Sequence, residues 1–368
     1  MNDREVKGFN NPEELRSFLV EREKNTKWIS DINVSDVGFE AIPKEVAVSE
    51  NEEWKDTVLN GTGIWLLYGS LIYPVRACAM QSIFDRTGTR CSFISALPSK
   101  RKAEILSEAC EYADTSCRWG YNPEKERRKG QLYIVDGKVS AFLSDNRTKI
   151  DYRNQDSSEV FNLVKEAIEN VSTVEKFDGF YSYEFLDTTW KMDKKVQLDG
   201  IDGSINTYNI VFHFSTSDVG KAALSLSTKL TDGISTIPVG NGKIPHRKKM
   251  SGVDFNNVID QLMKQIDNSQ NDYDDLKNVV VHFPVQCLKN IVKEYQMPVK
   301  IGNEIIANYE KKFGNIPTTA YTLFLVLCQI NEILFNRCIE KVDYRNQQEL
   351  NVLKTLSPSV WIKNDTNL

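Results

Sequence analysis

The segment Gly130–Asp151 constrains the fold of this chain more than any other. Apolar runs lie on both sides of the dipeptide Asp136-Gly137. Asp-Gly between such runs is typical of a β-hairpin, because a two-residue type I′ turn needs a positive φ at both central residues. The sequence therefore predicts a hairpin, which would bring the polar residues Asp145, Arg147 and Lys149 to one defined place.

Composition places the chain among soluble folded proteins. Its 368 residues allow one large or two ordinary domains, and its contents of 40% hydrophobic and 26% charged residues are ordinary. The longest apolar run, Ala320–Leu334, is too short and too polar to span a bilayer, and the N-terminus lacks the apolar core of a signal peptide. Seven cysteines without regular spacing favour reduced thiols. We expect a cytoplasmic protein without membrane association.

The net charge of −5 limits what the surface can bind. It argues against a protein that wraps nucleic acid over its whole surface, but a local basic groove on an acidic body is compatible with it. The first sixty residues are acidic, whereas basic clusters occur at 100–102, 125–129 and 246–249.

Periodicity of apolar residues predicts both helices and strands. Asn11-Pro12-Glu13-Glu14 is typical of a helix start, and this helix should reach Glu23. Helical spacing recurs at 99–113, 157–171, 253–266, 303–313 and 318–339, and strands are expected over 28–43, 61–79, 180–185 and 208–214. The order lacks strict βαβ alternation. It predicts an α+β fold, with an antiparallel sheet, packed helices and a helical C-terminal part.

Shifts in charge and pattern suggest four regions. We expect an acidic N-terminal arm with a short helix at 1–60, an α+β core domain at 61–250, a helical region at 251–345 and a tail at 346–368. The last residues of the tail, 357–368, are polar at their end and should be loose.

No motif fixes a reaction. The three histidines, His213, His246 and His282, lie far apart and outside the spacings of zinc sites, so neither a metal nor a cofactor is predicted. His213 follows Val-Phe and is interpreted as a strand histidine whose ring is satisfied. Asp145 and Asp151 leave a metal-dependent nuclease open as an alternative, because spacing alone does not show whether carboxylates converge on an ion.

Basic clusters with aromatic residues between them are the main functional signal. In single-strand grooves, Lys and Arg neutralise phosphates while bases stack on aromatic rings. Solvated surface charge would explain the same pattern without a ligand. The predicted nucleic-acid contacts are Lys100, Arg101, Lys102, Arg118, Trp119, Tyr121, Arg127, Arg128, Lys129, Arg147, Lys149 and Arg153. Trp119 and Tyr121 would stack on bases, and Asp145 would orient Arg147.

The strand and loop after Asp136 resemble a known sequence pattern. GKVSAFLSDNRTKIDY, residues 137–152, resembles a motif of the uncharacterised phage/plasmid-like protein family, a domain of unknown function found in prophages, phages and plasmids. Its matching residues are Gly137, Val139, Ala141, Leu143, Ser144, Asp145, Ile150 and Asp151. A second segment, 214–226, is also similar, and the resemblance covers roughly 130–266. The acidic N-terminus does not fit, and Asp232 stands where the family has Asn.

This resemblance implies a mobile-element protein near DNA replication, recombination or host defence, and it carries over no catalytic residues. We therefore expect a non-enzymatic protein of a phage, prophage or plasmid that binds single-stranded DNA in recombination or replication. The alternative is an anti-defence or regulatory factor that docks on a protein partner through acidic surfaces, including Glu13–Glu23 and Glu50–Asp56. The sequence leaves open whether the chain forms a homo-oligomer.

Overall fold

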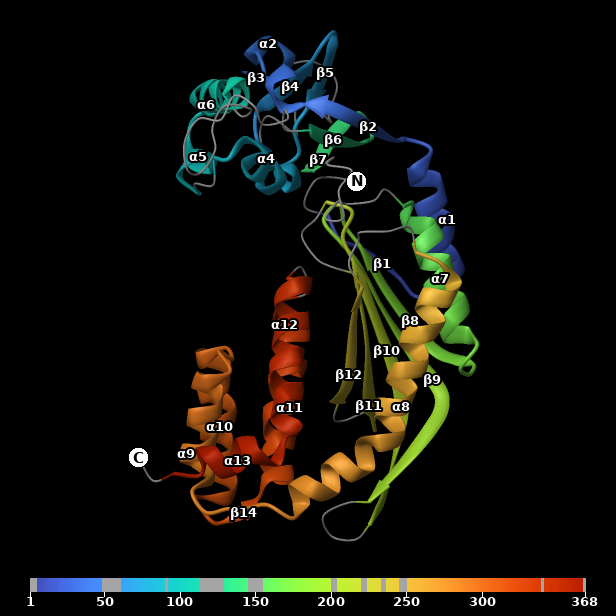
Figure 1. The fold of residues 1–368 in the computed structure, drawn as a ribbon, viewed down its shortest axis with the longest axis vertical. Coiled ribbons are helices and arrows are strands. Elements are labelled where there is room, and N and C mark those ends of the chain that lie inside the picture. Colours follow the sequence, from blue (N-terminus) through green and yellow to red (C-terminus); the bar gives the residue numbers. More distant parts are fainter. Residues whose placement is uncertain are drawn as a thin grey trace.

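The computed structural model describes residues 5–47, 61–89, 92–112, 129–144, 155–199, 204–219, 224–232, 236–244, 250–338 and 341–366. These residues form antiparallel sheets and packed helices, so the α+β prediction is confirmed, including the helical C-terminal part (Figure 1).

A six-stranded antiparallel sheet is the centre of the molecule. Its strands, in spatial order, are β1 (Lys7–Phe9), β8 (Val174–Tyr181), β9 (Leu186–Asp199), β10 (Ile205–Thr216), β11 (Leu224–Thr231) and β12 (Thr236–Ile244). Side chains alternate between the two faces of a strand. In β10, Phe212 and Phe214 are fully buried on one face, which we call the apolar face. His213 and Ser215 lie on the opposite, polar face.

Three helices cover the apolar face: α1 (Pro12–Glu23), α7 (Ser157–Glu169) and α8 (Gly252–Lys277) (Figure 1). Trp190 of β9 lies 4.5 Å from the ring of Phe177 and 5.8 Å from that of Phe161 of α7, centroid to centroid. Helix α8 is longer than the predicted 253–266. A capping box of Ser251 and Asp254 starts it, and its C-terminal half still buries apolar side chains such as Leu276.

A smaller α/β unit contains the predicted hairpin. Its two three-stranded sheets are β2 (Thr26–Asn33), β6 (Lys129–Val135) and β7 (Lys138–Ser144), and β3 (Val37–Ala41), β4 (Ile64–Tyr68) and β5 (Leu71–Pro74). Its helices are α2 (Lys44–Ala47), α4 (Met80–Thr87), α5 (Ser92–Ala96) and α6 (Ser99–Glu111), with short 3₁₀ turns at Val34–Asp36 and Ala77–Ala79. Ile83, Leu106 and Phe142 share a separate core.

The β6–β7 hairpin is confirmed. Asp136 has φ 51° and Gly137 has φ 72°, the two positive values that a type I′ turn needs. Tyr183, in the turn between β8 and β9, donates a hydrogen bond to the Asp136 carboxylate at 2.9 Å. The hydroxyl of Tyr133 similarly bonds Asp218 at 3.3 Å. Through these bonds the hairpin is attached to one end of the main sheet.

The positive φ at Gly137 gives a first testable expectation. A Cβ there would meet no atom within 4 Å, so Gly137→Ala introduces backbone strain without a clash. We expect the free energy of unfolding, measured by urea denaturation, to fall by about 1–2 kcal/mol. The control is Gly252→Ala, where φ is not positive and the nearest atom, on Leu163, is 3.9 Å away. An equal loss in both variants would contradict the strain argument.

The C-terminal helices are α9 (Pro284–Glu294), α10 (Val299–Phe313), α11 (Ala320–Arg337), α12 (Val342–Leu353) and α13 (Pro358–Asn364), with a 3₁₀ turn at Lys354–Leu356 and a two-stranded ribbon of β13 (Val280–Val281) and β14 (Thr318–Thr319). Within the tail expected at 346–368, the prediction that 357–368 is loose is wrong over its described part, because α13 packs on α9 and Trp361 is fully buried. Trp361 anchors this segment in the core, whereas the polar residues at the end of the sequence suggest a segment without such an anchor.

The N-terminal arm expected at 1–60 is also wrong over its described residues. Strand β1 pairs with β8 of the main sheet, while β2 and β3 belong to the two smaller sheets. In helix α1, Glu13, Glu14 and Glu21 are exposed, whereas Leu15 and Leu19 are fully buried. The predicted strand at 180–185 ends at Tyr181, because 182–185 turn into β9.

The longest apolar run of the sequence, Ala320–Leu334, lies within α11. Among the described helices, none is long and apolar enough to cross a membrane. Cys287, Cys328 and Cys338 are free thiols, and Cys78 and Cys110 are buried.

Candidate ligand groove on the polar face of the sheet

The polar face of the main sheet carries side chains in ordered rows. Directly paired residues on adjacent strands share a face. Across β9, β10 and β11 the rows are Lys191–Val211–Lys229, Thr189–His213–Ser227 and Asp187–Ser215–Ser225. His213 therefore lies in the middle of the face, with a lysine diagonal to it on each neighbouring strand.

Helices α11 and α12 lie on this side of the sheet, opposite α7 and α8 (Figure 1). Between the sheet and α11 is a cavity of about 380 Å³, which we call the sheet groove. This volume is within the range of small-ligand sites, about 300–1,000 Å³. The groove is lined by Lys176, Asp178, Thr189, Lys191, Val211, His213, Lys229, Thr231, Thr236, Asn331, Glu332, Phe335 and Asn336.

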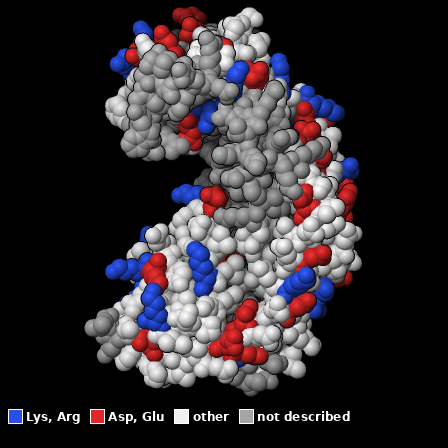
Figure 2. Space-filling model, in the orientation of Figure 1, with Lys and Arg blue, Asp and Glu red and all other residues white. Residues whose placement is uncertain are grey.

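Each lysine of the sheet groove has an acidic partner. Lys176 pairs with Asp178 at 2.8 Å, Lys191 with Glu175 at 3.1 Å, and Lys229 with Glu349 of α12 at 2.7 Å. On the face of the molecule that Figure 2 shows, basic and acidic side chains are interspersed. The lysines are thus held in place, and a bound anion would compete with carboxylates for them.

Glu332 of α11 is the second carboxylate on the wall of the groove. It accepts a hydrogen bond from the backbone N–H of Thr236 at 2.7 Å. Burial raises the pKa of Glu332, and this hydrogen bond opposes the rise. Its carboxylate therefore serves to attach α11 to the start of β12.

A buried ionic network lies at the inner end of the groove. His213 Nε2 is 2.5 Å from Asp187 Oδ1, and Arg345 Nη2 of α12 is 2.5 Å from Asp187 Oδ2. Burial alone would raise the pKa of Asp187, but the charges and hydrogen bonds of His213 and Arg345 hold it well below its usual range. Asn346 adds a hydrogen bond to Ser215 at 2.8 Å.

This network sets the orientation of the His213 ring. Nε2–H donates to an ionised carboxylate, so in the neutral ring Nδ1 carries the lone pair. In many acid–base sites a carboxylate bonds one ring nitrogen of a histidine, and the other ring nitrogen acts as the base. His213 is indeed a strand histidine with a bonded ring, as the sequence suggests, but it also lines the groove.

Of the nucleic-acid contacts predicted from sequence, four are described. Lys100, Arg101 and Lys102 lie in the first turn of α6, and Lys129 starts β6. Lys102 is buried and donates to the carbonyl of Thr62 at 3.3 Å. Arg101 pairs with Glu104 at 3.0 Å, and Lys129 with Asp31 at 3.0 Å.

The other predicted contacts lie outside the described residues. They are Arg118, Trp119, Tyr121, Arg127, Arg128, Arg147, Lys149 and Arg153. Asp145 and Asp151, the carboxylates of the nuclease alternative, also lie there. Among the described residues, no group of three or more His, Cys, Asp or Glu side chains could hold a metal ion.

Two of the acidic residues proposed to dock on a basic partner are engaged within the protein. Glu13 pairs with Lys165 of α7 at 2.8 Å. Glu23 accepts hydrogen bonds from both the N–H and the hydroxyl of Ser158, at 2.7 and 2.5 Å. Residues 48–60, the other acidic stretch, lie outside the described part of the chain.

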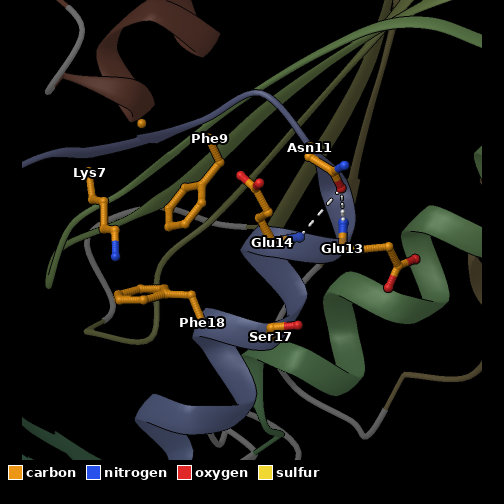
Figure 3. Close-up of a pocket in the computed structure, with 8 residues that line it drawn as sticks. Lys7, Phe9, Asn11, Glu13, Glu14, Ser17 and Phe18 are labelled. Atoms are coloured by element: carbon orange, nitrogen blue, oxygen red, sulfur yellow. Dashed lines mark hydrogen bonds between the residues drawn. The ribbon is translucent and has the colours of Figure 1, made fainter.

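A second, shallower cavity of about 540 Å³ lies between β1 and α1 (Figure 3). Lys7 Nζ is 4.4 Å from the ring centroid of Phe18 and 5.3 Å from that of Phe9. The Asn11 side chain accepts hydrogen bonds from the N–H groups of Glu13 and Glu14 and so caps α1. These polar groups serve the helix start, which makes this cavity a weaker candidate than the sheet groove.

Comparison with known proteins gives no match: no protein-family model fits the chain, and no curated protein or solved structure is significantly similar to it. The resemblance to the phage/plasmid-like family therefore stays a prediction.

Proposed function

We propose that the sheet groove binds a single strand of nucleic acid. The observation that carries this is the placement of Lys176, Lys191 and Lys229 on three strands around one cavity, each in an ion pair whose carboxylate a phosphate could replace. Ammonium groups neutralise phosphates, which supplies most of the affinity in such complexes.

The other groups on the groove wall suit the remaining parts of a nucleotide. Asn336 of α11 is exposed on the groove wall, and its amide can donate to and accept from base edges. Phe335 lies next to Asn336 and is partly exposed. The Arg345 guanidinium is 5.1 Å from its ring centroid, so a base would stack on the ring face away from Arg345. The groove would hold one nucleotide, and the flanking strand would follow the polar face of the sheet.

Removing two of the lysines tests this site. We expect Lys176→Ala combined with Lys191→Ala to weaken binding of a labelled single-stranded oligonucleotide, measured by fluorescence anisotropy between about 50 and 200 mM salt. The slope of log K against log salt should also become shallower, by about 0.7 for each phosphate that the protein no longer neutralises.

The matched control is Lys194→Ala. Lys194 is exposed and lies on β9, as Lys191 does, but it does not line the groove. It should leave both affinity and slope unchanged. If the double variant binds like the wild type, the groove is not the site. A parallel charge reversal of Arg127 and Arg128 would then show whether the clusters predicted from sequence carry the binding instead.

A further inference from the structure

We propose that His213 is a general base that cleaves an RNA strand bound in the sheet groove. The inference rests on the proposed function for the presence of the strand, and it adds a reaction and a substrate class. The observation behind it is that one groove contains an oriented histidine and two flanking ammonium groups.

The orientation of the base is the first step of the argument. Asp187 bonds Nε2 and is itself held by Arg345, both at 2.5 Å. All three side chains are buried, so the ring has little freedom to turn. Nδ1, the nitrogen that Asp187 does not bond, would take the proton from a ligand in the groove, which this 3% exposed side chain lines. Such a base contributes about 10²–10⁴-fold to a rate.

The charges around His213 are the second step. In the strand register, Lys191 of β9 and Lys229 of β11 both lie opposite Val211 of β10. Val211 is two residues from His213, so the two lysines lie in the next row of the polar face. Diagonal neighbours across a sheet are about 7–8 Å apart, within reach of long side chains. A phosphate beside the imidazole would thus compete with Glu175 for the Lys191 ammonium group and with Glu349 for that of Lys229.

RNA is the nucleic acid that this set of groups can cleave. Its 2′-hydroxyl is an internal nucleophile, already positioned next to the phosphate, and needs only a base and charge stabilisation. His213 Nδ1 takes the 2′-hydroxyl proton as the 2′-oxygen bonds to phosphorus. The bond from phosphorus to the 5′-oxygen breaks, and that oxygen takes a proton from the Lys191 ammonium. The products are a 2′,3′-cyclic phosphate and a 5′-hydroxyl.

Lys229 has the stabilising role in this scheme. Glu349 holds its ammonium group at 2.7 Å, and the side chain is 15% exposed. It would lie against the non-bridging phosphate oxygens, where negative charge increases in the transition state. Water then returns the proton to Lys191 and removes that of His213, so the site is restored.

The test uses the full-length protein and end-labelled single strands of one sequence, as RNA, as DNA and as 2′-O-methyl RNA, in the presence of a chelator. We expect cleavage of the RNA only, with cyclic-phosphate ends identified by mass spectrometry. His213→Asn, purified in the same way, should cleave at least 100-fold more slowly. The two non-cleavable strands test the chemistry without any substitution, so the result does not depend on the variant folding.

The outcomes separate the two proposals. RNA that binds to the wild type but stays intact would overturn the role of His213 and leave the proposed function standing. Strands that do not bind at all would overturn both. Cleavage that His213→Asn retains while its circular dichroism matches the wild type, or cleavage of DNA that appears only when magnesium replaces the chelator, would assign the activity to other residues.

Discussion

Replacing Asp187 with alanine is expected to lower the free energy of unfolding by about 3–5 kcal/mol. The carboxylate is buried between His213 and Arg345, which it bonds through its two oxygens. Its removal leaves a guanidinium, itself 6% exposed, without this counter-charge in the interior. Breaking a buried pair on one side costs more than the pair contributes, because the remaining charge stays desolvated.

Two variants make this expectation specific. Asp187→Asn keeps one hydrogen-bond acceptor and should lose less than Asp187→Ala. Asp178→Ala removes a carboxylate from the same face, but this side chain is 33% exposed and pairs with a lysine that is 67% exposed. Surface pairs contribute about 0–1 kcal/mol, so this control should be nearly neutral. Equal losses at Asp178 and Asp187 would mean that the buried network is not the cause.

The effect of Asp187 should depend on pH in one direction. The pKa of its carboxyl is lower in the folded protein than in the unfolded chain, where it is about 3.9. The ionised form therefore stabilises the fold above that unfolded value, and the contribution is lost as pH falls toward the folded pKa. Urea denaturation should show the full difference between wild type and Asp187→Ala at pH 7, and a shrinking one below about pH 4.

Local signals account for what the sequence predicts well. The Asp136-Gly137 turn specifies its hairpin from two residues, and α7 follows directly from its apolar spacing. Pairing between distant strands is different, because register depends on packing over the whole sheet. Strand β1 has three residues, too few for a pattern, and its place beside β8 is fixed by α1.

The candidate site is harder to predict for the same reason. The alternation of Asp187, Thr189 and Lys191 with buried residues indicates that β9 has one polar face. It does not show which residues of β10 and β11 lie opposite them in the sheet. Arg345 is 158 residues from the carboxylate that it bonds. Basic clusters are the stronger sequence signal, yet Lys102 shows that a lysine in such a cluster can be buried against a backbone carbonyl.

Replacing Trp361 with alanine should also cost about 3–5 kcal/mol of unfolding free energy. The side chain is fully buried, and its Nε1–H donates to the carbonyl of Thr355 at 2.7 Å. Its own carbonyl lies 3.9 Å from the thiol of Cys287 on α9. Deleting the ring would leave a cavity, remove the donor to Thr355 and loosen α13 from α9.

Neighbouring residues supply both a control and a reason for the size of the effect. Ile362, next in sequence, is 66% exposed, so Ile362→Ala should change stability by less than about 0.5 kcal/mol. Farther along the chain, the Asp365 carboxylate accepts hydrogen bonds at 2.8 Å from the backbone N–H groups of His282 and Phe283. These two residues directly precede α9, which begins at Pro284. Loss of Trp361 would release these hydrogen bonds too. The measurement is urea denaturation followed by circular dichroism, because the substitution removes a fluorophore. A decrease of less than about 1 kcal/mol in the free energy of unfolding would contradict this packing and favour the loose tail that the sequence suggests.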